Sequence, residues 1–341
     1  MNIACIGNIV HDATAYFGVD IVLGGKNSSG DVKHTIGGPA STAASVIAKG
    51  DHHVDFYGQV GMDEIGVGAI KEMTDEKINM DNVYKDPEDF TPNSFIAVDP
   101  KGDRTIFSMS SQNNHGFAII KKFNIQKVYD YILTDGKYGP QSVELIKKNK
   151  LANPNAISII DAGRWNAGVL EVCRHVDYII CSEEFANNVT GCTINYEKDN
   201  MTNILGLLED KFPNAKGITI TVGERGYICR KNGEVVLVPA YRPKEPTIDT
   251  NGAGDIFHGA FTHALASGLD YYDSLEFAKI TAAISTTAYG GRKSCPDLSV
   301  VQEIFMKQKE LEAKYIPQII EPPKKEDQQT LVRKPKNFPK K

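Results

Sequence analysis

The segment DTNGAGDIFHGAF, residues 249–261, places two glycines at a turn and an acidic residue directly behind them. It reads as a tight turn that enters a helix with Asp255 in its first turn. Free backbone N–H groups at such a turn bind anions, and a carboxylate beside them is able to take a proton from a hydroxyl. The pattern indicates an anion hole at Gly252, Ala253 and Gly254 and a base at Asp255. The structural alternative is that Asp255 only complements the helix dipole.

A second glycine-rich segment, IGGPASTAASVIAKG, covers residues 36–50. Gly37 and Gly38 let the backbone approach a ligand closely, and the small residues that follow let a helix pack tightly. A small-residue helix that packs on a sheet without any ligand explains this segment equally well.

Neither segment matches a common nucleotide-binding fingerprint. The first has no Gly-Lys-Ser/Thr, so it is not a P-loop. Gly7 follows the first apolar run but lacks the second and third glycines of a dinucleotide-binding turn. These two kinds of phosphate site are therefore excluded.

Five apolar runs supply the framework that must position these residues: MNIACIG, VYDYILTDG, AISIIDAG, VDYIICSE and KGITITVG. Helical-looking segments follow most of them, which is typical of a parallel sheet covered on both faces. The predicted fold class is therefore α/β. Open α/β sheets bind ligands at the carboxyl ends of their strands. We expect that edge to carry Asp12, Asp135, Asp161, Ser182 and Gly223.

Residues 13–36 and 91–112 break the alternation with short runs such as SFIAVDPKGDRTIFSM. They predict antiparallel strands outside the main sheet, in a small β-flap over the ligand edge. A further hairpin, GYICRKNGEVVLVPAY, turns at Asn232-Gly233. After a single domain of residues 1–316, residues 317–341 are rich in Pro, Lys and Gln without apolar periodicity. That composition predicts a basic, disordered tail.

The bulk composition excludes several classes of partner. A net charge of −5 and a pI near 5.9 argue against nucleic acid and against a membrane surface. We expect neither a signal peptide nor a membrane span, since no run reaches ~18 apolar residues. The six cysteines form no Cys-x-x-Cys pair. Scattered cysteines of this kind favour reduced thiols and a cytoplasmic location.

Together the two glycine-rich segments resemble those of the ribokinase-like carbohydrate kinases, the PfkB family. The resemblance covers residues 1–306 and includes GQVGMDEIG, TVGERG and GGRKSCPD. It implies a three-layer fold whose mostly parallel central sheet is flanked by helices, with a small β-flap as lid. It also implies transfer of the γ-phosphate of ATP to a sugar hydroxyl with Mg²⁺. Many members bind a monovalent cation such as K⁺ near the anion hole.

The resemblance implies a role for each matching residue. Asp255 is similar to the general base, and Gly252, Ala253 and Gly254 to the anion hole. The implied substrate-binding positions include Asp12, Gly37, Gly38 and Thr42. The implied nucleotide-binding positions are Thr221, Gly223, Gly226, Gly290 and Gly291.

The sequence departs from the family pattern in two places. Thr42 stands where many members carry an Asn that touches substrate. The usual Asn-x-x-Glu motif, which helps to organise Mg²⁺-bound water, maps onto SEEF, with Ser182 and Phe185 at its ends. The metal shell must therefore differ. Glu183 and Asp249 are candidate metal residues, although a surface glutamate explains Glu183 equally well.

These departures, with GDIFHGA and GGRKSCPD, are similar to the sulfofructose kinase branch, which phosphorylates the 1-hydroxyl of 6-deoxy-6-sulfofructose. The matching sulfonate positions are Lys26, Ser108 and Lys137, of which only Lys26 agrees outright with the branch. A lysine neutralises a sulfonate but lacks the bidentate fork of Arg. A solvated surface position explains each lysine as well, and a neutral ketose or pentose is the competing substrate.

Arg104 either reaches the active site from the flap or stabilises the flap hairpin. Arg164 and Trp165 follow a strand end and are candidates to line the sugar or nucleotide pocket. His258, in the helix of Asp255, is interpreted as structural.

Other functions stay open at this point. Fructokinase, ribokinase, 2-keto-3-deoxygluconate kinase and nucleoside kinase activities fit the same family. A degenerate sugar- or nucleotide-binding sensor fits the altered SEEF motif, and a scaffold fits a tail that recruits a partner. Flaps of this fold often pair between subunits, so we expect a homodimer through the flap.

Overall fold

The structure is a computed structural model that describes residues 1–100, 104–110 and 127–315. Ten strands of these residues form the main sheet, in the order β14-β13-β12-β11-β10-β9-β1-β4-β5, with β6 paired to β4. All pairs are parallel except those that β13 makes with β12 and β14. The bounds are β1 Asn2–Ile6, β4 His53–Gly61, β5 Ile78–Asn79, β6 Val83–Asp86, β9 Tyr131–Thr134, β10 Ile157–Ala162, β11 Tyr178–Ser182, β12 Gly217–Thr221, β13 Tyr227–Lys231 and β14 Glu234–Val238.

Two apolar clusters lie on opposite faces of this sheet. Strand β1 shows why, because Ile3 and Cys5 join one cluster while Ala4 and Ile6 join the other. On the first face pack α1 (Pro39–Lys49), α2 (Glu64–Asp75), α8 (Ala253–Ala266), α9 (Tyr271–Ser285) and α10 (Leu298–Tyr315). On the second face pack α4 (Gly139–Ala152), α5 (Ala167–Cys173), α6 (Glu183–Thr190) and α7 (Lys198–Lys211). The expected three-layer α/β fold is confirmed.

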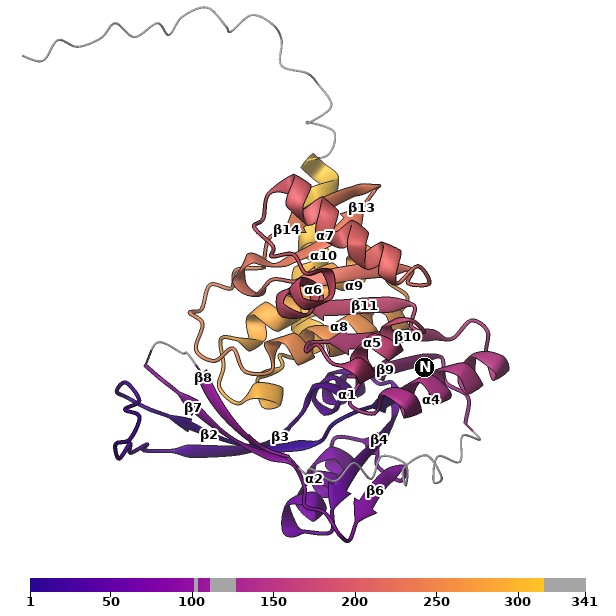
Figure 1. The fold of residues 1–341 in the computed structure, drawn as a ribbon. Helices are drawn as coiled ribbons and strands as arrows, with labels where there is room; N and C mark the ends of the chain where they lie inside the picture. Colours follow the sequence, from indigo (N-terminus) through magenta and orange to yellow (C-terminus); the bar gives the residue numbers. More distant parts are fainter. Residues whose placement is uncertain (101–103, 111–126, 316–341) are drawn as a thin grey trace, which may run out of the picture.

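The flap is a separate sheet with the strand order β3-β2-β7-β8. Its strands are β2 (Val10–Tyr16), β3 (Val32–Gly37), β7 (Asn93–Val98) and β8 (Arg104–Met109), and Figure 1 shows them extending away from the main sheet. The expectation of antiparallel strands holds for β2–β3 and β7–β8 but is wrong for β2 and β7, which run parallel. The chain between β2 and β7 passes through β4 of the main sheet, and such a crossover permits parallel pairing.

The expected second hairpin joins β13 to β14. Asn232 and Gly233 have φ values of +52° and +84°. Positive φ at both central residues is the geometry of a type I′ turn, so the Asn-Gly signal is confirmed. Residues 101–103, 111, 112 and 316–341, which belong to the flap, domain and tail predictions, lie outside the described residues.

All six cysteines are free thiols. Over the described ranges, no helix combines the length and the apolar character that crossing a bilayer requires.

Candidate active site

Helix α8 begins at the glycine turn that the sequence singled out. Gly252 is its N-cap with φ of +74°, a left-handed conformation that favours glycine. First-turn amides have no intrahelical acceptor, and the amide of Ala253 makes only a long contact, 3.4 Å, to the Thr250 carbonyl oxygen. A Cβ built on Gly254 would meet no atom within 4 Å. Gly254 therefore opens on empty space, which fits the close approach of a ligand.

Asp255 is the third residue of α8 and is partly buried. Burial raises its pKa to about 8, and the negative charge of Asp161 adds to that rise, followed by Asp135 and Asp12. Asp161 is buried near the end of β10, and burial with the charge of Asp135 raises its pKa to about 7. A carboxylate with a pKa near neutral is suited to accept a hydroxyl proton under physiological conditions.

Asp135, directly after β9, ties together three backbone segments at this edge of the sheet. Its carboxylate accepts hydrogen bonds from the amides of Asn8 at 2.8 Å, Lys137 at 2.9 Å and Ala40 at 3.4 Å. Asn8 follows β1 and Ala40 lies in the first turn of α1. Asp135 therefore fixes the approach of α1 to the strand ends.

Asp12 lies on β2 of the flap in a row of polar side chains. It pairs side by side with Thr35 of β3 and Ser94 of β7, and Ser94 pairs with Ser108 of β8. Residues paired in register share one face of a sheet. Burial raises the pKa of Asp12 to about 6, although a hydrogen bond from Ser94 opposes the rise.

Two other flap residues on the same face reach the turn before α8. The Tyr16 hydroxyl donates to Asp249 Oδ2 at 2.8 Å, and Arg104 Nη1 donates to Thr250 Oγ1 at 3.0 Å. Tyr16 lies four residues after Asp12, and both Tyr16 and Arg104 pair with Val98. The polar row of Asp12 therefore faces the turn before α8, and Arg104 contacts that turn from the flap.

We expect Tyr16→Phe to weaken this flap contact while the ring stays packed against Tyr289. A hydrogen bond to a charged group contributes about 1.5–3 kcal/mol, so kcat/KM should fall by roughly 10-fold or more. Steady-state kinetics and a melting curve measure the effect. Unchanged kinetics with a lowered Tm would show that the contact serves stability alone.

The double glycine packs between the flap and α1. A Cβ on Gly37 would lie 2.0 Å from Asp12 Oδ2, and Gly38, with φ of +101°, would place one 2.5 Å from the Asn8 carbonyl oxygen. The buried Thr42 donates its amide to the Gly38 carbonyl oxygen at 2.9 Å. These glycines let Asp12 and α1 come together, which is a packing role at the substrate side.

The expected nucleotide residues lie in two loops. Thr221 ends β12, and Gly223, with φ of +60°, opens on empty space. Gly226 is needed for packing, since a Cβ there would lie 2.0 Å from the Val238 carbonyl oxygen. In the second loop, Gly290 precedes the short helix η2 (Gly291–Ser294).

The second loop touches the turn before α8. The Gly290 amide donates to Asp249 Oδ2 at 3.2 Å, and the Asn251 amide donates to Asp249 Oδ1 at 2.8 Å. Gly291 lies against the same turn, because a Cβ on Gly252 would meet its carbonyl carbon at 3.4 Å. Asp249 therefore joins the flap, the turn before α8 and the glycine pair.

The two candidate metal residues both have protein partners. Asp249 is engaged as above, and Glu183 Oε2 accepts a hydrogen bond from the Tyr196 hydroxyl at 2.7 Å. Ser182 caps α6 by accepting from the Phe185 amide at 3.0 Å. Across the described ranges, no group of three or more His, Cys, Asp or Glu residues is arranged to hold a metal. A Mg²⁺ ion that keeps several waters and binds mainly to nucleotide phosphates needs only one or two protein carboxylates, for which Asp249 and Glu183 are the candidates.

The three candidate sulfonate residues differ in position. Ser108 shares the polar row of Asp12. Lys137 lies two residues from Asp135, where burial raises the pKa of the Asp135 carboxyl and the charge of Lys137 opposes that rise. Lys26 is exposed in the loop between β2 and β3. The structure thus connects two of the three residues to the carboxylates of the site.

Sequence reasoning missed Asn8, Tyr16 and Ser94. Asn8 Oδ1 and Asp161 Oδ2 are buried without a hydrogen-bond partner among the described residues, although His258 Nδ1 lies 3.2 Å from Asp161 Oδ2. A polyhydroxylated ligand supplies hydroxyl donors of the kind that such acceptors need. The position of Asn8 directly after a strand and Gly7 was a usable signal for it, whereas Tyr16 and Ser94 depend on flap register.

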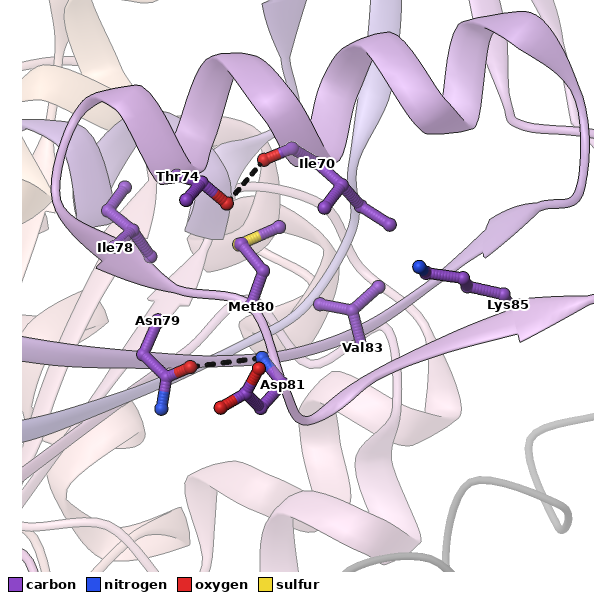
Figure 2. A pocket seen from close by; sticks show the side chains of 8 residues that line it. All are labelled: Ile70, Thr74, Ile78, Asn79, Met80, Asp81, Val83 and Lys85. Carbon is purple, nitrogen blue, oxygen red and sulfur yellow. Dashed lines mark hydrogen bonds between the residues drawn. The ribbon is translucent and has the colours of Figure 1, made fainter.

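A separate cavity of about 290 Å³ lies between α2 and the strands β5 and β6. Figure 2 shows Ile70, Ile78, Met80 and Val83 around it, with Lys85 at one side. Its lining residues include none of the four acidic residues Asp12, Asp135, Asp161 and Asp255. We assign it no part in the reaction.

Comparison with known proteins identifies the family. The family model described as pfkB family carbohydrate kinase matches residues 1–298. The chain belongs to the PfkB family. A ribokinase of Schizosaccharomyces pombe is 26% identical over 281 residues, which cover 79% of this chain and 86% of that protein. Fructokinase-2 of Oryza sativa is 24% identical over 323 residues, with 82% and 87% covered.

A solved structure supports the same conclusion for the fold. Arabidopsis thaliana ribokinase, complexed with ribose and ATP, superposes with a TM-score of 0.71 at 18% identity and covers 89% of this chain and 98% of its own. This PfkB chain is a phosphotransferase that uses ATP and acts on a carbohydrate hydroxyl. The relatives named here are ribokinases and a fructokinase, and none of them is a sulfofructose kinase.

Proposed function

We propose that Asp255 takes the proton of a sugar hydroxyl while the amides of Gly252, Ala253 and Gly254 receive the transferring γ-phosphate of ATP. The observation that carries this proposal is the raised pKa of Asp255 directly behind a turn where Gly254 opens on empty space. Phosphoryl transfer depends on positioning and charge stabilisation more than on covalent help. A positioned base and a set of aimed amides supply both.

In this proposal, the remaining candidate residues bind either the sugar or the nucleotide. Asp12 and the polar row of the flap hold the sugar, helped by Gly37, Gly38 and Thr42 through their packing. Thr221, Gly223, Gly226, Gly290 and Gly291 form the nucleotide side. The flap closes over the reaction and excludes water, which would otherwise compete as acceptor.

Mg²⁺ and a monovalent cation are part of the proposal. Mg²⁺ neutralises charge on the phosphates when it is bound. Asp249 and Glu183 would hold it, directly or through its bound waters. A cation such as K⁺ is expected near the anion hole. Chelation of Mg²⁺ should abolish turnover, and replacement of K⁺ by a large organic cation should lower it.

A neutral sugar is the substrate class that the site supports best. Four carboxylates, those of Asp12, Asp135, Asp161 and Asp255, act on one another within it. Carboxylates accept hydrogen bonds from hydroxyls but repel an anionic group placed among them. Ribose and fructose fit this requirement, as do the activities of the named relatives, and adenosine is a further neutral test compound. 2-Keto-3-deoxygluconate needs an added cation.

Sulfofructose is the second candidate, on one specific observation. Ser108 shares the polar row of Asp12, and the cationic Lys137 adjoins Asp135. A sulfonate at the rim of the site would meet these two residues while the sugar hydroxyls meet the carboxylates. Lys26 would have to swing in from its exposed loop.

The deciding experiment measures ATP consumption with Mg²⁺ and K⁺ over ribose, fructose, sulfofructose, 2-keto-3-deoxygluconate and adenosine. We expect the highest kcat/KM on a neutral sugar and little effect of Lys26→Ala or Lys137→Ala there. Preference for sulfofructose, with roughly 10-fold or greater loss in Lys137→Ala, would favour the second candidate. No turnover on any sugar while ATP still binds would favour a sensor.

Three remaining elements of the proposal concern assembly and location. Strand β8 is exposed throughout, with Phe107 and Met109 at 51% and 48% exposure, which supports a homodimer through the flap.

Deletion of residues 318–341 should leave kcat nearly unchanged, whereas a protein that acts as a scaffold through its tail would lose function. Free thiols and the use of ATP support a cytoplasmic location.

A further inference from the structure

His258 is buried on α8, three residues after Asp255, with acceptors on both sides of its ring. Its Nδ1 lies 2.7 Å from the Gly254 carbonyl oxygen and 3.2 Å from Asp161 Oδ2. Its Nε2 lies 3.1 Å from the Ile180 carbonyl oxygen of β11. The two carbonyl oxygens accept and do not donate, and the Asp161 carboxylate does the same when it is ionised.

A neutral imidazole does not suit these surroundings. It carries one N–H and one lone pair, so in either tautomer a lone pair faces a buried carbonyl oxygen. An unmatched pair of acceptors in the interior costs about 1–3 kcal/mol. The imidazolium donates from both nitrogens, and its charge lies beside the carboxylate of Asp161. The geometry is therefore that of a buried ion pair.

We propose that His258 is an imidazolium in the folded enzyme and acts as a positioning residue, whose charge offsets Asp161 and favours the ionised form of Asp255, the form that accepts the hydroxyl proton. This inference rests on the proposed role of Asp255. It assigns a function to a histidine that the sequence alone presented as structural.

The groups around His258 support this assignment. On α8 itself Asp255 is the charged neighbour, and Asp161 faces the ring from β10, with Asp135 and Asp12 farther out in the cluster. Strand β11 contributes only the Ile180 carbonyl oxygen. Helices α1 and α9 meet α8 through apolar contacts: Val46 lies against Gly259, and Phe277 packs against His263, farther along α8. His258 is thus the one cation that faces Asp161 and Asp255 among the described residues.

Opposing effects act on this ring. Burial is the largest effect and lowers the pKa of the His258 imidazole below its ordinary value, although the two carbonyl contacts and the charge of Asp255 oppose it. The imidazolium is favoured by the two carbonyl acceptors at the ring nitrogens and not by this balance. His258 also acts on Asp255. Its positive charge lowers the pKa of Asp255, whereas the neighbouring carboxylates raise it. Histidine and base are therefore linked, and a change in one must appear in the titration of the other.

The first test observes the ring directly in the full-length protein. Nitrogen chemical shifts of the histidine side chains, with His258 assigned by His258→Gln, report whether one or both ring nitrogens carry a proton. We expect an imidazolium at pH about 7, above the range in which an ordinary histidine is charged. A neutral tautomer at that pH would overturn the inference.

The second test compares pH profiles of kcat/KM for two variants. His258→Gln removes the positive charge and should move the acid limb upward by about one pH unit or more, whereas Asp161→Asn removes a negative charge and should move it downward. A structural role predicts an equal loss at every pH and no shift of the limb, which would contradict the inference. If Asp255→Asn kept full activity, the proposed base would fail while the ring measurement still stood.

Discussion

Asp255→Asn should lower kcat by about 10²–10⁴-fold with little change in KM, because the amide keeps the shape of the carboxylate but takes no proton. The protein should fold normally. Folding transfers Asp255 from water into a site that raises its pKa to about 8 from its ordinary value of 3.8. A carboxylate with a raised pKa costs stability progressively as the pH rises from about 4 to 8. The variant should therefore have a Tm at pH 8 at or above that of the wild type.

Asp273→Asn is the matched control for this prediction. Asp273 is the third residue of α9, as Asp255 is of α8, and its carboxylate contacts Lys309 at 2.6 Å outside the site. It should lose a little stability and keep its activity. Steady-state kinetics and melting curves across pH on both variants measure the contrast. Comparable activity losses in the two would mean that the helix position, and not a base, explains the effect.

Gly254→Ala should separate stability from activity. The position lies in the first turn of α8 with helical geometry, and no atom lies within 4 Å of a Cβ built there. Alanine in place of a helical glycine stabilises by up to about 1 kcal/mol. The new methyl group would occupy the space in which the phosphate approaches the amides. Without these amide hydrogen bonds to the transferring phosphate, the transition state is less stable by about 3 kcal/mol, so kcat should fall roughly 10²-fold or more.

Gly206→Ala is its control. Gly206 lies in the middle of α7, also with no atom within 4 Å of a Cβ position, and belongs to none of the loops of the site. It should gain similar stability and keep full activity. Full activity in Gly254→Ala would show that the anion does not bind at this turn.

Several elements followed from local sequence because local physics decides them. The apolar runs that became β1, β9, β10, β11 and β12 are continuous and end in polar or glycine residues, as strands covered on both faces do. The Asn232-Gly233 turn followed from the φ preferences of two residues. Strand β4 was missed, because HVDFYGQVG mixes apolar residues with polar ones. The apolar periodicity gives no sign that the polar Asp55 is buried. In the structure it is buried in contact with Tyr129 and Lys127.

The features of the candidate site also separate into those that follow from neighbours in the chain and those that depend on tertiary packing. The order of residues in DTNGAGD determines a left-handed glycine, free amides and an acidic residue in one helical turn, since all three depend on neighbours in the chain. The parallel course of β2 and β7, the reach of Tyr16 to Asp249 across 233 residues and the contact of His258 with Asp161 depend on tertiary packing. The sequence by itself determined the fold class and the glycine turn with its acidic residue. Only the tertiary structure decided which charges meet there, because electrostatic interactions depend on distance through space and on burial.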